Sequence, residues 1–105
     1  MSESSGFKSR VLNFIKKIPK GKVVSYGQVA AAAGSPRAAR QVGGILKALG
    51  AGTEIPWWRV VNRNGEISIK GNWEFEKQQQ ANFLKSDGVL VNENFVLDME
   101  KFCFK

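Results

Sequence analysis

Two adjacent tryptophans, Trp57 and Trp58, lie in the stretch IPWWRVV at residues 55–61, between a proline and an arginine. Two side chains of this size in a row can rarely both be buried on one side of a strand or helix, so we expect at least one to face a cleft or the solvent. An indole offers a flat apolar ring and one N–H donor, and it has no atom suited to nucleophilic attack. The chemistry that these residues suit is therefore stacking against a flat ring.

Residue types that usually perform catalysis are scarce in this sequence. Histidine is absent and Cys103 is the only cysteine, so the commonest general base and the commonest metal ligand are missing, and one cysteine cannot form a zinc site or a disulfide. Cys103 lies in FCFK among apolar neighbours, where we expect a packed or frayed thiol and assign it no role. The composition disfavours enzymatic catalysis, and we expect neither a metal nor a cofactor.

The chain is strongly basic. Sixteen Lys and Arg residues oppose nine Asp and Glu residues, for a formal net charge of +7. This excess of positive charge favours an anionic partner, and nucleic acid is the leading candidate.

Length and hydropathy indicate one domain that covers residues 1–105. A chain of 105 residues, 43% hydrophobic and 24% charged, suits one globular unit with one modest core. No run of about 18 apolar residues is present, and MSESSGFKSR lacks the apolar stretch of a signal peptide. We expect a monomeric cytoplasmic protein that associates with the nucleoid and does not contact a membrane.

Short helices must position the residues that could do chemistry. Apolar residues recur at helical spacing over residues 7–18, which predicts a first helix that stops at Pro19. After the extended stretch KVVS, Ser25 and Gln28 have the spacing of a capping box, which predicts a second helix over residues 26–33.

A third helix is expected to begin almost at once, because Ser35 followed by Pro36 has the pattern of an N-cap with proline at the first helical position. Two helices joined by so short a turn outline a helix-turn-helix. One arc of the third helix is apolar, and the opposite, outward arc carries basic and very small residues: Arg37, Arg40, Gly43, Gly44 and Lys47.

The two glycines on this arc indicate a close approach by another molecule or element. Each lowers helix stability by about 1 kcal/mol relative to alanine. Another element of the protein could pack against Gly43 and Gly44, but Arg40 and Lys47 would then be forced near an apolar surface. Phosphate or a nucleic-acid groove suits this mixture better, since glycine removes bulk and arginine supplies charge.

The C-terminal half is expected to add a small β element and one more helix. IPWWRVV, the turn NRNG and EISIK form two short extended segments, which predicts a hairpin or wing. Residues 74–85 are expected to form a helix that ends before Gly88, and the tail VLVNENFVLDMEKFCFK alternates weakly and could form strands. The predicted fold class is mainly α with a small β hairpin, a winged helix-turn-helix-like single domain.

Three motifs together resemble a known family. SYGQVAAAAGSPRAARQVGG, IPWWRVVNRNG and SDGV, within about residues 7–90, resemble the C-terminal DNA-binding domain of the O6-alkylguanine-DNA alkyltransferases, which transfer an alkyl group from guanine to a cysteine. Their signature reads IPCHRVV, so Trp57 stands in place of the acceptor cysteine and Trp58 in place of its histidine partner. Tryptophan in place of the acceptor cysteine is typical of the alkyltransferase-like proteins, which this sequence therefore resembles. That resemblance implies binding of O6-alkylguanine in double-stranded DNA without alkyl transfer, and direction of the lesion to nucleotide excision repair proteins.

The resemblance implies DNA-contact roles for the second and third helices. Arg40 matches the family arginine that enters the base stack and fills the space left by a flipped nucleotide. Tyr26 matches the family tyrosine that contacts the phosphate beside that nucleotide, and Ser25 could share this anion site.

The lesion pocket is expected around the tryptophan pair. By the resemblance, Trp57 takes the volume in which the cysteine would receive the alkyl group, and Trp58 lies at the pocket edge. Pro56 fixes the approach of the loop, and Val60 and Val61 are expected to bury its far side. Arg59 either anchors the loop or contacts DNA.

Two more residues are placed near the pocket by the same motifs. Lys70 could act as a second residue that selects the lesion, through its charge near guanine O6 or N7. The alternative is that it contacts a phosphate or is a solvated surface lysine. Asp87 matches a family glutamate and is expected to be at most a remnant of the catalytic relay.

Two other classes of function compete with a damage sensor. A helix-turn-helix transcription regulator of intact DNA would need side chains suited to base edges, and the third helix offers chiefly Ala, Gly and two arginines. An enzyme using Cys103 would need that thiol to reach the pocket and to acquire a partner without any histidine.

Overall fold

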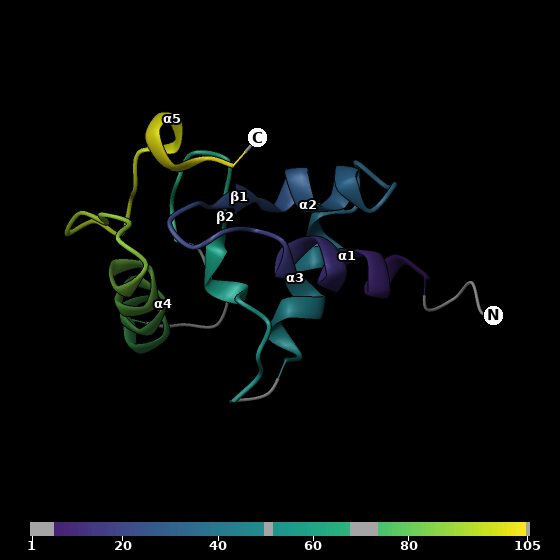
Figure 1. Cartoon of the computed structure of the whole chain (residues 1–105), viewed down its shortest axis with the longest axis horizontal. Coiled ribbons are helices and arrows are strands. Elements are labelled where there is room, and N and C mark those ends of the chain that lie inside the picture. Colours follow the sequence, from purple (N-terminus) through teal and green to yellow (C-terminus); the bar gives the residue numbers. More distant parts are fainter. Residues whose placement is uncertain (1–5, 50–51, 68–73, 105) are drawn as a thin grey trace.

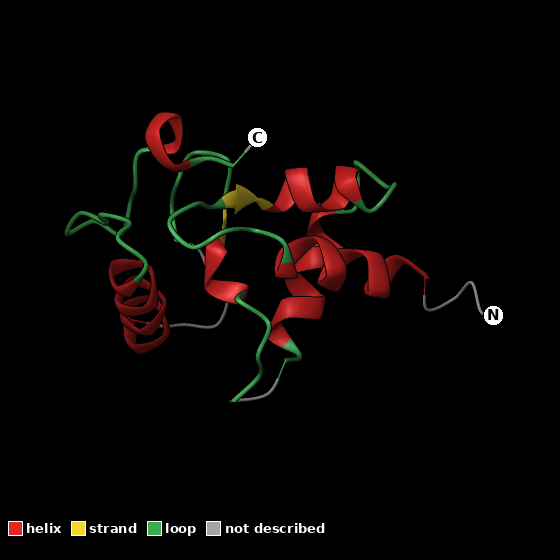
Figure 2. Cartoon of the chain, viewed as in Figure 1, coloured by secondary structure: helices red, strands yellow, loops and turns green. Residues whose placement is uncertain are grey.

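The computed structural model describes residues 6–49, 52–67 and 74–104, which are mostly helical with a small two-stranded sheet (Figures 1 and 2). Figure 1 shows the strands between a group of three helices, α1 to α3, and the separate helix α4. The elements in chain order are α1 (Gly6–Lys16), β1 (Val24–Ser25), α2 (Tyr26–Ala32), α3 (Ala39–Lys47), the 3-10 helix η2 (Trp57–Arg59), β2 (Val60–Val61), α4 (Glu74–Ser86) and α5 (Met99–Phe102).

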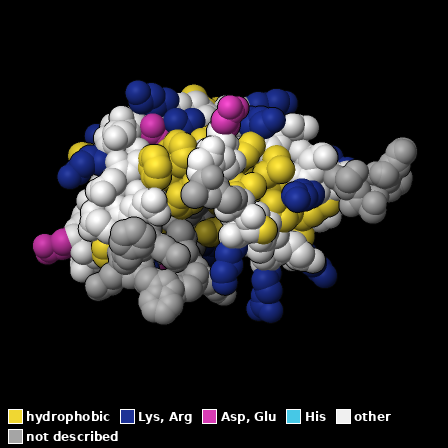
Figure 3. Space-filling view, turned by 90° about the horizontal axis from the view of Figure 1, so that it is seen from below, with side chains coloured by type: hydrophobic (Ala, Val, Ile, Leu, Met, Phe, Trp, Pro, Cys, Tyr) yellow, Lys and Arg dark blue, Asp and Glu magenta, His cyan; other side chains and the backbone are white. Residues whose placement is uncertain are grey.

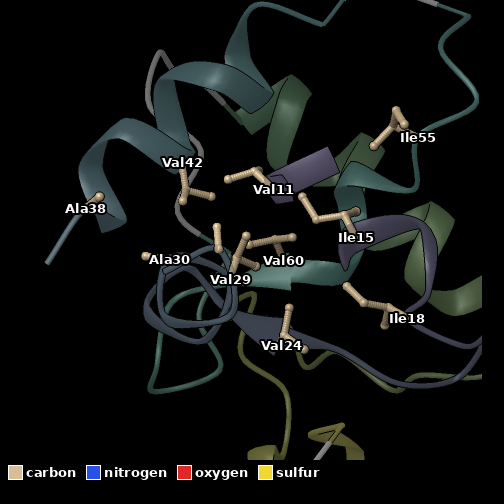
Figure 4. Close-up of a cluster of buried hydrophobic side chains, with 11 residues drawn as sticks. Val11, Ile15, Ile18, Val24, Val29, Ala30, Ala38, Val42, Ile55 and Val60 are labelled. Carbon is tan, nitrogen blue, oxygen red and sulfur yellow. The ribbon is translucent and has the colours of Figure 1, made fainter. Parts of the chain in front are cut away.

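The two strands separate two hydrophobic clusters. They are parallel, with Val24 opposite Val60 and Ser25 opposite Val61. Val24 and Val60 are buried in the cluster formed with α1, α2 and α3 (Figure 4), whereas Val61 and the neighbouring Val23 are buried in a second cluster with α4 and the C-terminal segment. Successive side chains of a strand point to opposite faces, so one short sheet serves both clusters.

The first two helices confirm the sequence prediction closely. α1 buries Val11 and Ile15, and its end at Lys16 lies just before the predicted stop. α2 has the predicted capping box, in which the Gln28 amide donates to Ser25 Oγ at 3.1 Å and the Ser25 amide donates to Gln28 Oε1 at 3.0 Å.

The predicted start of the third helix is wrong by three residues. α3 begins at Ala39, and its N-cap, Ala38, makes no side-chain capping bond. The reason is that Ser35 completes the end of α2: its amide donates to Ala30 O at 2.9 Å, while Gly34, at φ +92°, donates to Ala31 O at 3.0 Å. This is a Schellman motif. Residues 35–38 then form a turn closed by the Ala38 amide and the Ser35 carbonyl, at 2.9 Å.

The small β element is present, but its partners differ from the predicted hairpin. Residues 60–61 pair in parallel with β1, while the Ile67 amide donates to Phe95 O at 3.0 Å and the Leu97 amide donates to Gly65 O at 2.9 Å. Gly65 has φ +84°, and a Cβ at this position would overlap the carbonyl oxygen of Leu97. The segment after the NRNG turn therefore pairs with the C-terminal tail. The absence of a side chain at Gly65 allows the backbone of the tail to lie this close.

The remaining predictions for the C-terminal half are confirmed in part. α4, Glu74–Ser86, agrees with the predicted last helix and ends before Gly88. The tail forms isolated bridges, Glu66 with Val96 and Val23 with Cys103, and also a short helix, α5, that the sequence pattern did not predict.

Candidate nucleic-acid interface

The outward face of α3 is open to solvent. Arg40, Gly44 and Lys47 are exposed, and Arg37 is exposed in the turn that precedes the helix. A methyl group added at Gly44 would meet no described atom within 4 Å, whereas one added at Gly43 would lie 3.9 Å from the Tyr26 ring, an ordinary contact. Packing of another described element therefore does not explain Gly44, and the alternative of an external partner is favoured.

Tyr26 begins α2 with its ring close to Gly43 of α3, and Ser25 is the N-cap of the same helix. Tyr26 packs half-buried against the cluster beneath α3, and this burial raises the pKa of its hydroxyl above the ordinary tyrosine value, 10.0. At neutral pH the hydroxyl is protonated and able to donate to a phosphate oxygen. Ser25 is buried and its oxygen already accepts the Gln28 amide, so helix capping is its observed role.

The tryptophan pair lies in η2, immediately after the buried Pro56 and before the buried Val60. Both indoles are partly exposed. Trp57 meets Trp58 edge-on at 5.9 Å between ring centroids and meets Phe83 edge-on at 6.0 Å. Trp58 stacks on Phe83 at 4.4 Å with an angle of 16° between the planes. The three rings form one aromatic group, which combines the predicted pair with a residue that sequence analysis did not single out.

Arg59 is an anchor of this turn. Its Nε donates to Asp87 Oδ2 at 2.8 Å, its Nη2 donates to Asp87 Oδ1 at 3.2 Å and its Nη1 donates to the Ile18 carbonyl at 2.9 Å. The side chains of the ion pair are only 14% and 7% exposed. Of the two roles expected for Arg59, this geometry favours the structural one.

Asp87 and Gln80 contact the same turn, and sequence analysis gave neither a working role. Asp87 Oδ2 also accepts the Trp58 indole N–H at 3.0 Å. Gln80 is buried, and its Nε2 donates to the carbonyl oxygens of Trp58 and Val60, both at 3.0 Å. The match of SDG to the family glutamate was a signal for Asp87, but nothing in the run QQQ at residues 78–80 marks one glutamine as buried.

Other expected site residues fall elsewhere. Lys70 lies outside the described residues. Cys103 lies next to β1, where it bridges to Val23 and its Sγ donates to Gln28 Oε1 at 3.2 Å. In the described ranges no three His, Cys, Asp or Glu residues gather as a metal site, and no helix there is long and apolar enough to cross a membrane.

The surface seen from below combines charge with apolar area. Figure 3 shows Lys and Arg side chains projecting from opposite edges of this face, with hydrophobic side chains exposed between them. Cations suit a phosphate backbone, and exposed apolar surface suits bases that leave the stack.

Comparisons with known proteins identify the family of this chain. The family model "6-O-methylguanine DNA methyltransferase, DNA binding domain" matches residues 6–89. A DNA base-flipping protein of Escherichia coli is 46% identical over 102 residues, which cover 97% of this chain and 77% of that protein. Alkyltransferase-like protein 1 of Schizosaccharomyces pombe is 35% identical, with 94% of each chain covered.

A solved structure is similar over the whole chain. S. pombe Atl1, in complex with damaged DNA containing O6-carboxymethylguanine, has a TM-score of 0.90 and 34% identity, with 100% of this chain and 99% of that chain covered. The chain belongs to the family of the 6-O-methylguanine DNA methyltransferase DNA-binding domain, as an alkyltransferase-like member.

Proposed function

We propose that this protein is a non-enzymatic sensor of O6-alkylguanine in double-stranded DNA, which flips the damaged nucleotide and directs it to nucleotide excision repair. The observation that carries the proposal is the partly exposed Trp57 in η2, which by the resemblance of IPWWRVV to IPCHRVV matches the acceptor cysteine of the related enzymes. Its ring lies edge-on to both Trp58 and Phe83. A flipped base with an apolar substituent finds there an aromatic wall.

The open face of α3 supports nucleotide flipping. Extrusion of a base costs a few kcal/mol of stacking and pairing, which contacts to the rest of the DNA must offset. Arg40 is exposed and able to enter the base stack, and at Gly44 no described side chain stands between the helix and an approaching groove. Tyr26, with a protonated hydroxyl at the start of α2, suits the phosphate beside the extruded nucleotide.

Alkyl transfer is excluded from the proposal on chemical grounds. The indole N–H of Trp57 is a donor and offers no lone pair for displacement of an alkyl group from oxygen. The Trp58 N–H is directed at Asp87 in place of a histidine that would activate a thiol. The chain's one thiol, Cys103, lies on the C-terminal segment beside β1, where its Sγ donates to Gln28 Oε1 at 3.2 Å.

The proposal includes the partners and state expected from the sequence. The protein acts as a monomer on DNA in the cytoplasm, at the nucleoid, and hands the lesion to excision-repair proteins. Names of relatives support the DNA-damage part, since one is a DNA base-flipping protein and another was crystallised on O6-carboxymethylguanine DNA. Resemblance to the alkyltransferase-like proteins supports the link to excision repair.

One experiment tests the proposal against its alternatives. The protein is incubated with otherwise identical duplexes carrying guanine or O6-methylguanine, and binding is measured by gel shift and protein mass by intact mass spectrometry. We expect tighter binding to the lesion and an unchanged protein mass. Equal affinity for the two duplexes would favour a regulator of intact DNA, and a protein adduct of one methyl group would favour an enzyme.

A further inference from the structure

One side of α4 and its C-terminal turn faces the η2 turn with three different side chains. Gln80, Phe83 and Asp87 are separated by three and four residues, the spacing of neighbours along one side of a helix. Each contacts the tryptophan pair or its flanking residues. The contacts are of different kinds, so each restricts a different movement of the turn.

Asp87 restricts the side chains that follow Trp57. Its carboxylate accepts three hydrogen bonds: one from the Trp58 indole at 3.0 Å, and two from Arg59 at 2.8 and 3.2 Å. Arg59 also donates to the Ile18 carbonyl, at the end of the segment that follows α1. The carboxylate therefore ties the indole of Trp58 and the guanidinium of Arg59 to one point, and Arg59 ties that point to the N-terminal helices.

Gln80 restricts the backbone of the same turn. Its amide nitrogen donates to the carbonyl oxygens of Trp58 and Val60, both at 3.0 Å, which lie on either side of Arg59. A 3-10 turn of three residues makes few hydrogen bonds of its own, and here the Arg59 amide reaches Pro56 O at 3.1 Å. External donors and acceptors therefore determine its position.

Phe83 contacts both tryptophan rings and so links the position of Trp58 to that of Trp57. It stacks under Trp58 at 4.4 Å and meets the Trp57 ring edge-on at 6.0 Å. Trp57, unlike Trp58 and Arg59, makes no side-chain hydrogen bond to a described residue, so among these residues its ring orientation depends on Trp58 and Phe83. A shift of Trp58 would move the support on which Trp57 rests.

We propose that Asp87, assisted by Gln80, is a positioning residue of the lesion site: it holds Trp58 and Arg59 so that Trp57 is presented in the orientation that receives a flipped alkylated base. The inference rests on the proposed function and adds to it the group that organises the site. Asp87 touches neither the base nor the alkyl group in this role. It transfers no proton and acts on Trp57 through Trp58 and Arg59.

The test compares lesion preference, defined as plain-duplex Kd divided by O6-methylguanine-duplex Kd, across variants of the full chain at a temperature where each is folded. Asp87→Ala should lower this preference about tenfold, the size of a direct coupling between neighbouring side chains, with plain-duplex affinity changed less than about twofold. Asp87→Asn keeps one acceptor oxygen and should lower the lesion preference by a smaller factor than Asp87→Ala. Asp87→Glu keeps the carboxylate and should retain part of the lesion preference that Asp87→Ala loses.

The matched control is Asp98→Ala. Asp98 is another carboxylate that accepts more than one hydrogen bond, two from the amides of Glu100 and Lys101, but it caps α5 and makes no hydrogen bond to η2 among the described residues. Its loss should lower the melting temperature and leave lesion preference unchanged. Both variants are compared at a temperature where unfolding is negligible, so a loss of lesion preference in Asp87→Ala alone identifies positioning.

A double variant tests whether Asp87 acts through Trp57. In a Trp57→Ala background, Asp87→Ala should reduce lesion preference no further, since the ring being positioned is gone. An equal tenfold loss in both backgrounds would overturn the inference, as would an unchanged preference in Asp87→Ala and Asp87→Asn. If the unaltered protein shows no lesion preference, the proposed function itself is wrong and the inference falls with it.

Discussion

The outward face of α3 and the η2 turn are both assigned to DNA, and they are built in opposite ways. Arg40, Gly44 and Lys47 are exposed, and at Gly44 no described atom would meet an added side chain within 4 Å. In η2, Arg59 makes three hydrogen bonds to residues far away in sequence, and Trp58 makes one and stacks on Phe83.

The α3 face therefore has the character of an exposed contact surface, whereas the conformation of η2 depends on hydrogen bonds and stacking with other parts of the protein. Truncation of an exposed cationic side chain on α3, such as Arg40, removes an interaction proposed with DNA and leaves the fold nearly unchanged, because that side chain is exposed. Substitution of Trp58 or Arg59 in η2 leaves a buried partner without its hydrogen bond and changes the fold around it. We therefore expect truncations on the α3 face to change mainly DNA affinity, and substitutions of the hydrogen-bonded residues of η2 to change mainly the free energy of unfolding.

The largest expected effect is on stability, in η2. Arg59→Ala leaves the carboxylate of Asp87, 7% exposed, without its ion-pair partner and should lower the free energy of unfolding by about 3 kcal/mol. Arg40→Ala is the matched control, since Arg40 is exposed, and should change it by less than about 0.5 kcal/mol. Urea denaturation of both variants measures the contrast, and similar losses would remove the distinction between the regions.

Trp57→Ala should affect lesion binding next most strongly. Loss of one aromatic wall should weaken binding to an O6-methylguanine duplex about tenfold, the effect of removing one base-stacking side chain. Binding to the unmodified duplex should stay nearly the same, because phosphate contacts supply it. Fluorescence anisotropy with both duplexes gives the two dissociation constants, and equal losses on both would contradict the pocket role.

Arg40→Ala should weaken discrimination between flipped and intact DNA. We expect a loss of several-fold in affinity for the lesion duplex, since the vacated stack is no longer filled. A base analogue such as 2-aminopurine, placed beside the lesion, reports unstacking directly by its fluorescence. Unchanged unstacking in the variant would show that Arg40 contacts DNA only as a surface cation.

Gly44→Ala should move stability and binding in opposite directions. Alanine should stabilise α3 by about 0.5–1 kcal/mol, because the position is helical and the added methyl meets no described atom. The same methyl should weaken DNA binding if a groove approaches this face closely. Thermal unfolding and gel shift on one preparation test both parts, and unchanged DNA affinity would show that the groove lies farther away.

Tyr26 should show the smallest effect, through pH. Burial raises the pKa of its hydroxyl in the folded state above 10.0, so folding favours the protonated phenol. This contribution to stability is fully present below pH 10 and is lost as the pH rises through the folded pKa. Tyr26 is the chain's only tyrosine, so phenolate absorbance follows its titration directly, and Tyr26→Phe removes the dependence. An unshifted titration would contradict its packing beneath α3.

Local patterns predicted the parts of the fold that neighbours in sequence determine. The capping box of Ser25 and Gln28 predicted the start of α2, because both partners lie within one helical turn. The same reasoning placed α3 too early. Ser35 looks like an N-cap in isolation, but its amide is bound by Ala30, so the end of one helix displaced the start of the next.

Pairing across the chain was beyond such patterns. The valines of β2 alternate between two hydrophobic clusters and pair with β1, and nothing near Val60 in sequence indicates that partner. Gly65 was predicted as part of a turn, yet its second role, admitting the carbonyl of Leu97, depends on a segment about thirty residues away.

The amino-acid sequence determined the family, the helical framework and the basic, glycine-containing face of α3, because these depend on residue types and short spacings. Only the tertiary structure decided how the tryptophan turn is held. Two segments distant in sequence meet here: Trp58 and Arg59 of η2, and Gln80 and Asp87 of α4 and its C-terminal turn. Their hydrogen bonds form only because the fold brings these segments together, which no local sequence pattern predicts.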